Sequence, residues 1–222
     1  MRIKRLELRV NLLGALFFIL YSLFLLLPSV HAQVSDIGEA RINAASPFYF
    51  LQSVREILEY KFAKTTDVKA NLELKFANRR LAEVNSLAKS SDQSLIEPTL
   101  IAYLVDLDQL IGHANIRDET PARNLSNEIK LHMSFLQNIY GIVSDPRARM
   151  SIRATINNLS LWDLRLIDGL NSAKQSAIAE EIIDSRLSAC SFLSKEASDS
   201  ALNGVERAIL SERANKCRNI KP

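Results

Sequence analysis

The sequence is poor in the residues that build catalytic and cofactor-binding sites. Its 222 residues include two cysteines, three histidines, six glycines and one tryptophan. The glycines are too dispersed to cradle a phosphate group, and the chain has no Gly-x-Ser-x-Gly or His-Glu-x-x-His motif. We therefore predict no catalytic residue, no metal site and no cofactor, and we expect a protein that is not an enzyme.

Beyond the N-terminal 32 residues the chain has no excess of positive or negative charge. Residues 1–32 hold four of the 28 Lys and Arg residues and one of the 25 Asp and Glu residues, so residues 33–222 carry 24 of each sign. A neutral chain with scattered basic residues gives no support for nucleic-acid binding. The apolar content of 47% is too high for a disordered chain.

The first 32 residues have the pattern of an export signal. Basic residues come first, then the apolar run Leu12–Leu27, then Pro28 and the ending Val30-His31-Ala32. We predict cleavage between Ala32 and Gln33. The run is longer than the roughly 7 to 15 residues of most cleaved signals, so retention as an uncleaved anchor is the alternative. Either outcome makes the body secreted or places it on the extracytoplasmic face of the membrane. Membrane contact is expected only through this segment, if it is uncleaved.

Apolar residues beyond the signal recur at intervals of three and four, and no alternating β-branched run indicates a strand. The pattern predicts an all-α fold: a multi-helix bundle of antiparallel hairpins, with about six or seven helices after the N-terminal signal helix. Predicted helix starts lie at Ser46-Pro47, Thr66-Asp67, Pro98, Thr120-Pro121 and Asp145-Pro146.

The polar joint Ala114–Thr120 is the predicted boundary between two helical subdomains, 45–114 and 120–222. Residues 33–44 are predicted as a short linker. The stretch from 172 to 218 stays helical in pattern, with Asn203-Gly204 as its turn signal.

The first predicted hairpin carries a specific pattern. It reads Ser46-Pro47-Phe48-Tyr49-Phe50-Leu51 at its start and Ala77-Asn78-Arg79-Arg80-Leu81-Ala82-Glu83 in its second helix. Over about residues 45–114 the chain resembles an exported bacterial helical family, the domain of unknown function 5667. Members open with Ser-Pro-aromatic-Tyr-x-Leu-Lys after a signal or membrane helix, and Gln52 stands here in place of that Lys. The resemblance implies a helical bundle outside the membrane and names no activity or ligand.

Two interpretations of these residues are open. In the first, Phe48, Leu51 and Phe50 or Tyr49 clasp the second helix, while Arg79 and Arg80 reach acidic residues on a neighbour. In the second, the cluster Phe48, Tyr49 and Phe50 is a contact patch that docks a partner or the membrane surface, because aromatic residues are favoured in contact patches.

The two histidines outside the signal do not form a metal-binding pattern. His132 lies on the apolar stripe of its helix with Glu128 four residues earlier, whereas helical di-iron sites use a spacing of three and further ligands. We expect a core histidine held by one hydrogen bond, and we expect His113 to interact with the dipole at a helix C-terminus. Ser86 and Lys89 fit a Ser-x-x-Lys pattern, but its companion motifs are missing.

The carboxylate groups are interpreted as surface features. Asp106 and Asp108 lie two positions apart on one helix, so they cannot share a face. A solvated, partly ion-paired surface is expected for Glu180, Glu181, Asp184, Lys174 and Arg186.

Cys190 and Cys217 are a natural disulfide pair in an exported chain. On one unbroken helix their 27-residue separation would hold the sulfurs about 40 Å apart. A fold-back at Asn203-Gly204 brings them side by side, and we predict the disulfide on that basis. A turn near Glu196–Ser198, with Asp199 as the next helix cap, would leave both thiols free.

The sequence therefore predicts a non-enzymatic exported helical bundle that acts in the cell envelope as a structural or protein-interaction module, with an envelope protein as its partner. The alternative is an extracytoplasmic small-ligand or metal sensor with a pocket between helices near His132 and Trp162. Trp162 is otherwise expected to be a packing anchor.

Overall fold

The described part of the chain is built from helices. A computed structural model describes residues 37–114, 116, 118–172, 176–199 and 202–218, with backbone alone at 171–172, 176–181, 184–185 and 218. The seven described α-helices and one 3-10 turn are α2 (Tyr49–Phe62), α3 (Thr66–Ala88), η1 (Gln93–Leu95), α4 (Ile96–His113), α5 (Glu119–Tyr140), α6 (Pro146–Ser172), α7 (Ser176–Glu196) and α8 (Gly204–Arg218). The predicted all-α fold is confirmed. The signal segment and its cleavage site at Ala32 and Gln33 lie outside the described residues.

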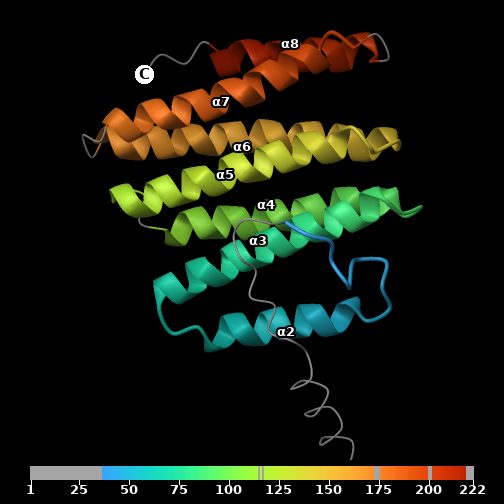
Figure 1. Ribbon diagram of the computed structural model, residues 1–222, viewed down its shortest axis with the longest axis vertical. Helices are drawn as coiled ribbons and strands as arrows, with labels where there is room; N and C mark the ends of the chain where they lie inside the picture. Colours follow the sequence, from blue (N-terminus) through green and yellow to red (C-terminus); the bar gives the residue numbers. More distant parts are fainter. Residues whose placement is uncertain (1–36, 115, 117, 173–175, 200–201, 219–222) are drawn as a thin grey trace, which may run out of the picture. The chain divides into compact units, whose positions relative to one another are not determined.

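Residues 37–222 form a compact unit of their own. Within this unit the helices follow one another in chain order from α2 at one end to α8 at the other (Figure 1). The helix α3 packs on α4, α5 packs on α6, and α7 packs on both α6 and α8. In addition α6 packs on α4, and α5 contacts α3 and α7. None of the described helices is both long and apolar enough to cross a membrane.

One apolar core runs through the helices from α3 to α7. Its fully buried side chains include Leu81 of α3, Tyr103 of α4, Ile129 of α5 and Ile156 of α6. No residue of α2, which is described in full, belongs to this core.

Capping residues begin the helices near the predicted positions. The Asp145 carboxylate accepts a hydrogen bond from the Ala148 N–H at 2.7 Å, and Pro146 is the first residue of α6, as predicted. The predicted cap of α3 at Thr66-Asp67 is wrong by one residue, since Thr65 accepts from the Val68 N–H at 3.3 Å.

Gly169 lets the loop between α4 and α5 approach α6. A Cβ at this position would lie 3.1 Å from the side chain of Ile116. This loop is the joint that the sequence predicts as a subdomain boundary, and α4 and α6 pack on each other across it.

Cys190 of α7 and Cys217 of α8 form a disulfide, with 5.5 Å between their Cα atoms. The turn differs from the predicted one, because α7 ends at Glu196 and α8 begins at Gly204. Asn203 is the N-cap of α8: its side chain accepts from the Glu206 N–H at 2.9 Å, and Glu206 accepts from the Asn203 N–H at 3.3 Å. The chain therefore folds back between α7 and α8, although α7 ends before the predicted turn.

Candidate docking surface

The N-terminal helix α2 presents an apolar face to solvent. Of its 14 residues only Glu56 is buried. Its exposed large apolar side chains recur at intervals of three and four and therefore share one side of the helix. We call this set the α2 apolar face: Phe50, Leu51, Val54, Ile57, Leu58 and Phe62. Phe48, just before the helix, is exposed as well.

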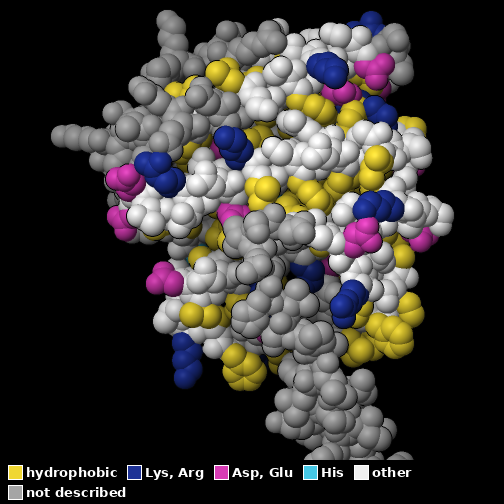
Figure 2. All heavy atoms as spheres, in the orientation of Figure 1, with side chains coloured by type: hydrophobic (Ala, Val, Ile, Leu, Met, Phe, Trp, Pro, Cys, Tyr) yellow, Lys and Arg dark blue, Asp and Glu magenta, His cyan; other side chains and the backbone are white. Residues whose placement is uncertain are grey.

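Hydrophobic side chains gather over α2 at the edge of the visible surface (Figure 2). Phe62 is 74% exposed and Ile57 is 66% exposed. The predicted clasp of Phe48, Phe50 and Leu51 onto the second helix is wrong, because these side chains point into solvent. Of the predicted contact patch, Phe48 and Phe50 lie on this exposed side, whereas Tyr49 faces α3.

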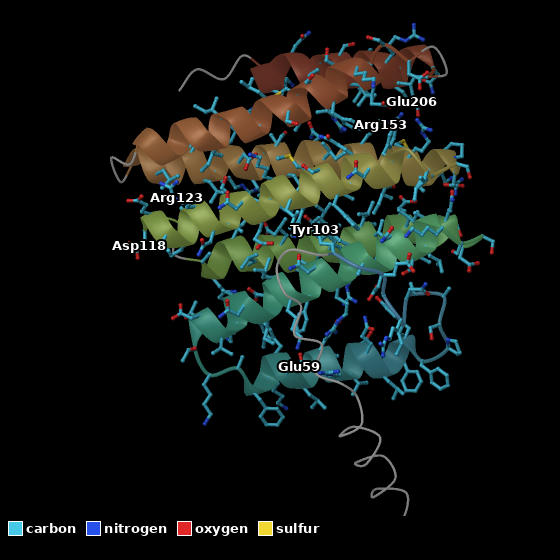
Figure 3. All side chains as sticks on the ribbon, viewed as in Figure 1. Glu59, Tyr103, Asp118, Arg123, Arg153 and Glu206 are labelled. Carbon is cyan, nitrogen blue, oxygen red and sulfur yellow. A yellow bond between two sulfur atoms is a disulfide. The ribbon has the colours of Figure 1, made fainter. Side chains whose placement is uncertain are left out.

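The opposite side of α2 is polar and holds the helix to α3. Glu59, labelled in Figure 3, accepts from Lys75 of α3 at 3.0 Å and from Arg55 of its own helix at 2.7 Å. Burial opposes ionisation of Glu59, but the hydrogen bonds from Lys75 and Arg55 outweigh it and lower the pKa of the carboxyl.

Glu56 is the centre of the contact between α2 and α3. Its carboxylate accepts from Arg79 Nη1 at 2.6 Å and from Arg80 Nη2. Burial opposes the charge on Arg80, but Glu56 and Glu83 outweigh it and raise the pKa of the guanidinium. The prediction that Arg79 and Arg80 reach acidic residues on a neighbouring helix is confirmed.

Tyr49 and Gln52 complete this contact through Glu83 of α3. The Tyr49 hydroxyl donates to Glu83 Oε2 at 3.2 Å, Gln52 Nε2 donates to Glu83 Oε1, and Arg80 donates to the same carboxylate at 3.1 Å. Burial and the Glu83 charge raise the pKa of Tyr49 to about 12. Gln52 is thus a hydrogen-bond donor in this network.

Asp106 of α4 joins the network from the other side. Its Oδ2 lies 3.6 Å from Arg80 Nε, too far for a hydrogen bond. Burial raises the pKa of Asp106 to about 7, although Arg80 opposes the shift. Asp108 lies on a different face, exposed and 3.0 Å from Arg165, as the spacing of the two residues predicts.

His132 is a fully buried histidine whose two ring nitrogens are both occupied. Nδ1 lies 2.9 Å from the Tyr103 hydroxyl and Nε2 lies 2.6 Å from Asn78 Oδ1, while Glu128 Oε2 is 3.8 Å away. Tyr103 donates to Nδ1 and Nε2–H donates to Asn78 if the ring is neutral, and burial lowers the pKa of His132 to about 3. The histidine has two hydrogen bonds rather than the one that we predicted.

Asp163 and Arg186 are buried charged residues on the facing helices α6 and α7. Among the described residues neither carboxylate oxygen of Asp163 has a hydrogen-bond partner, and burial raises its pKa to about 8 against the attraction of Arg186. The prediction that Arg186 lies on a solvated surface is therefore wrong. The side chains of Lys174, Glu180, Glu181 and Asp184 are outside the described part, and Trp162 is buried in the core, as predicted.

The remaining candidate residues make structural contacts. His113 is the last residue of α4 and its Nδ1 lies 3.0 Å from Glu73. Ser86 accepts from the Ala40 N–H at 3.0 Å, and Lys89 pairs with Glu39, so both hold residues 37–44 along α3. Among the described side chains, no three His, Cys, Asp or Glu residues come together as metal ligands would.

A hollow on the surface is lined only by serines, one amide and one carboxylate: Ser90, Ser91, Gln93, Ser94, Ser144 and Asp145. Gln93 Oε1 accepts from the N–H groups of Ser144 and Asp145, each at 2.9 Å. The Oδ1 atom of Asp145 is engaged in the cap of α6. The hydrogen bonds across the hollow join η1 to the start of α6.

Comparison with known protein families gives one match. Residues 42–146 match the family model of a domain of unknown function, DUF5667. The chain contains a DUF5667 domain. The match extends beyond the predicted limits of 45–114, since it includes α5 and ends at the start of α6. No curated protein and no solved structure matches the chain.

The DUF5667 domain thus contains α2, both of its faces and the network that holds it. The sequence interpretation missed Val54, Ile57, Leu58 and Phe62 as surface residues. A signal was present: the polar positions of α2 carry Glu56 and Glu59, and the next predicted helix carries Lys75, Arg79 and Arg80 at buried or half-buried positions.

Proposed function

We propose that this protein is an extracytoplasmic, non-enzymatic helical module that works by docking through the α2 apolar face. The observation that carries the proposal is the orientation of α2, which turns its polar side to the bundle and its apolar side to solvent. An amphipathic helix of a soluble bundle ordinarily buries its apolar stripe. A contiguous exposed apolar face is typical of an interaction site.

The polar network supports this proposal because it fixes the orientation. Glu56, Glu59 and Tyr49 all find partners on α3, so a rotated α2 that buried its apolar face would break these contacts and deprive the buried Arg80 of Glu56. The exposed apolar face is therefore specified by the sequence of both helices.

The buried polar side chains favour docking over a ligand-sensing role. Both ring nitrogens of His132 are occupied by hydrogen bonds, and Trp162 is packed in the apolar core. Within the part of the chain that the structure describes, no pocket near these residues supports the alternative prediction of a ligand site.

Photo-crosslinking in cells tests the proposal. A benzophenone amino acid in place of Ile57 should form adducts with neighbouring molecules on irradiation, because this position is 66% exposed on the α2 apolar face. The matched control replaces Val205 of α8, which is 71% exposed and lies on a helix at the other end of the bundle. Adducts at neither position, or equal adducts at both, would contradict docking through α2.

A further inference from the structure

The size of the α2 apolar face limits what can cover it. The face consists of six side chains on a helix about 21 Å long. A stable protein interface takes in about 20 to 30 residues on each partner. The face by itself is therefore too small to hold a second copy of the chain, whereas an interfacial helix needs only a few apolar side chains to enter a lipid surface.

The charges around α2 fit an anionic lipid surface. Glu56 and Glu59 are turned to α3 and paired there, so they do not oppose an anionic surface. Lys61 and Lys64 are exposed at the C-terminal end of the helix, where Asp67 is the nearest exposed carboxylate in the sequence. Exposed lysines beside aromatic and aliphatic side chains are typical of helices that lie in the plane of a membrane interface.

The position of α2 in the bundle permits such a contact. It lies at one end of the stack of helices, so its outer side can approach a flat surface while α3 to α8 stay in water (Figure 1). Phe50, Val54, Ile57 and Phe62 lie along that outer side. An interfacial helix buries its apolar side by about 5 to 10 Å, a depth that side chains of this length can reach.

The order of segments along the chain places α2 early. It is the first described helix after the apolar run Leu12–Leu27, and residues 28–48 separate the two. This connection is at most about 70 Å long when fully extended. If the run stays as an anchor, the length of this connection limits the distance between α2 and the bilayer. If it is removed, α2 offers a membrane contact that does not depend on it.

We infer that the α2 apolar face rests on a membrane surface rich in anionic phospholipid, with Lys61 and Lys64 at the headgroups and the rest of the bundle in water. This inference rests on the proposed function and names the occupant of the same face. It chooses the membrane surface from the two occupants that the sequence leaves open for the contact patch, and it extends the contact along the whole α2 apolar face.

Vesicle co-sedimentation tests the inference with residues 33–222, which include the whole compact unit at 37–222. Vesicles containing about one-quarter phosphatidylglycerol should bind this protein, and vesicles of phosphatidylcholine alone should bind it more weakly. The variant Ile57→Ser/Phe62→Ser should lose at least about ten-fold in affinity, because both side chains are exposed and contribute to binding and not to the core.

Val205→Ser is the matched control, since Val205 is as exposed as the two α2 residues but lies on α8, and its affinity should stay within about two-fold of the unchanged protein. Circular dichroism should show the same helix content in all variants. Lys61→Ser/Lys64→Ser should weaken binding to the anionic vesicles and reduce its dependence on salt.

Two results would overturn the inference. In one, the vesicles fail to bind the unchanged protein while residue 57 still crosslinks to a protein or to a second copy, so that the docking function stands and the lipid occupant is wrong. In the other, Ile57→Ser/Phe62→Ser binds vesicles as tightly as the unchanged protein, which would exclude the α2 apolar face as the lipid contact. Failure of crosslinking at residue 57 would separately contradict the proposed function.

Discussion

Asp163 is a buried carboxylate in the middle of α6 that has no hydrogen bond to any residue that the structure describes. It stands on the same stripe as Leu159, Leu166 and Leu170, at intervals of three and four, and Arg186 of α7 is the nearby charge that favours its ionised form. Burial outweighs this attraction and raises the pKa of Asp163 from 3.8 to about 8. The folded protein therefore binds a proton here that the unfolded chain releases.

The first prediction concerns the pH dependence of stability. Because the pKa of Asp163 is higher in the folded state, its contribution is present below about pH 4 and is lost as the pH rises to about 8. The slope from this one group can reach about 1.4 kcal/mol per pH unit. Asp163→Asn, which cannot ionise, should remove that slope from the free energy of unfolding, measured by urea denaturation between pH 5 and pH 9.

The pH dependence of the free energy of unfolding is a better readout than its absolute value. Arg186 keeps its charge in the variant, so the loss of its negatively charged neighbour also changes the absolute value. Asp108→Asn is the control, since Asp108 is an exposed carboxylate on the surface of α4 and its loss should leave the slope unchanged. An Asp163→Asn protein with the full slope of the unchanged chain would show that Asp163 titrates normally. Asp106, with a pKa of about 7, adds a similar decline in the free energy of unfolding from pH 4 to pH 7, both in the unchanged protein and in Asp163→Asn.

His132 changes the stability with pH in the opposite direction, and it does so at lower pH. Its pKa is lowered from 6.5 to about 3 by burial, so the unfolded chain binds a proton that the folded protein does not. This contribution to stability is present above about pH 6.5 and is lost as the pH falls to about 3. The two groups together limit maximal stability to a window of mildly acidic pH.

Among the elements, α2 is the least firmly attached. A 14-residue helix is marginal in isolation, and α2 adds no side chain to the apolar core. Its attachment depends on ion pairs and hydrogen bonds to α3, and such pairs contribute little net stability against an apolar contact of the same size. We therefore expect α2 to open locally more often than α3 or α4.

The second prediction follows from the place of Glu56. Glu56→Gln removes the negative charge that pairs with Arg79 and with the buried Arg80. Amide hydrogen exchange, followed by mass spectrometry, should become at least about ten-fold faster in α2 than in the unchanged protein. Exchange in α5 and α6 should change much less.

Glu119→Gln is the matched control for that experiment. It also breaks an ion pair, with Arg123 at 3.2 Å, but this pair is exposed on α5. Its effect on exchange in α2 should be negligible. Equal exchange in α2 for Glu56→Gln and the unchanged protein would show that the network does not hold the helix.

The third prediction concerns the hairpin of α7 and α8. The disulfide closes a loop with a sequence separation of 27 residues, so its loss should lower the free energy of unfolding by roughly 3 to 4 kcal/mol on the chain-entropy model. Chemical denaturation of Cys190→Ser/Cys217→Ser measures this, and reduction of the unchanged protein should have a similar effect. Two reactive thiols in unfolded, unreduced, exported protein would show that the bond does not form.

Other contacts also hold this hairpin to the bundle. Arg153 of α6 donates to the Tyr140 hydroxyl at 3.0 Å. The Arg153 guanidinium also lies 4.0 Å from the carboxylate of Glu206 of α8, and these two side chains are labelled in Figure 3. Leu193, Ala197, Leu210 and Ala214 form a small apolar cluster between α7 and α8. Loss of the disulfide is therefore expected to loosen the hairpin without unfolding α3 to α6.

The sequence predicted the helices well because their ends carry local signals. Asp145-Pro146 fixes the start of α6 and Pro98 lies in the first turn of α4, and neither depends on the rest of the fold. The orientation of α2 could not be predicted in the same way. Its apolar stripe at Phe50, Val54 and Ile57 indicates a buried face by the usual rule, and the pairing of the polar side of α2 with α3 reverses it.

Buried charges were harder to predict than helix ends. Arg186 looks like a surface residue in a charged stretch, because sequence spacing does not show which side of α7 meets α6. Asp163 could have been found, since it occupies a core position of the stripe that includes Leu159 and Leu166. The disulfide was predicted correctly, although α7 ends before the predicted turn.

At the scale of the whole molecule, the fourth prediction concerns processing. The exported protein should begin at Gln33, because the small-residue ending at Ala32 follows the helix-breaking Pro28. Intact-mass measurement of the extracytoplasmic form decides this. A mass that retains residues 1–32 would identify an uncleaved anchor instead, and would leave the location of the body unchanged.

The arrangement of the helices in chain order has a consequence for how the protein folds. Each helix from α3 onward packs mainly on the helix before or after it, so most stabilising contacts join segments that are close in the sequence. Such folds need little loop closure before contacts form and fold quickly. A chain that emerges N-terminus first can add one helix at a time to a growing bundle, and the bond between Cys190 and Cys217 can form only after α8 has joined it.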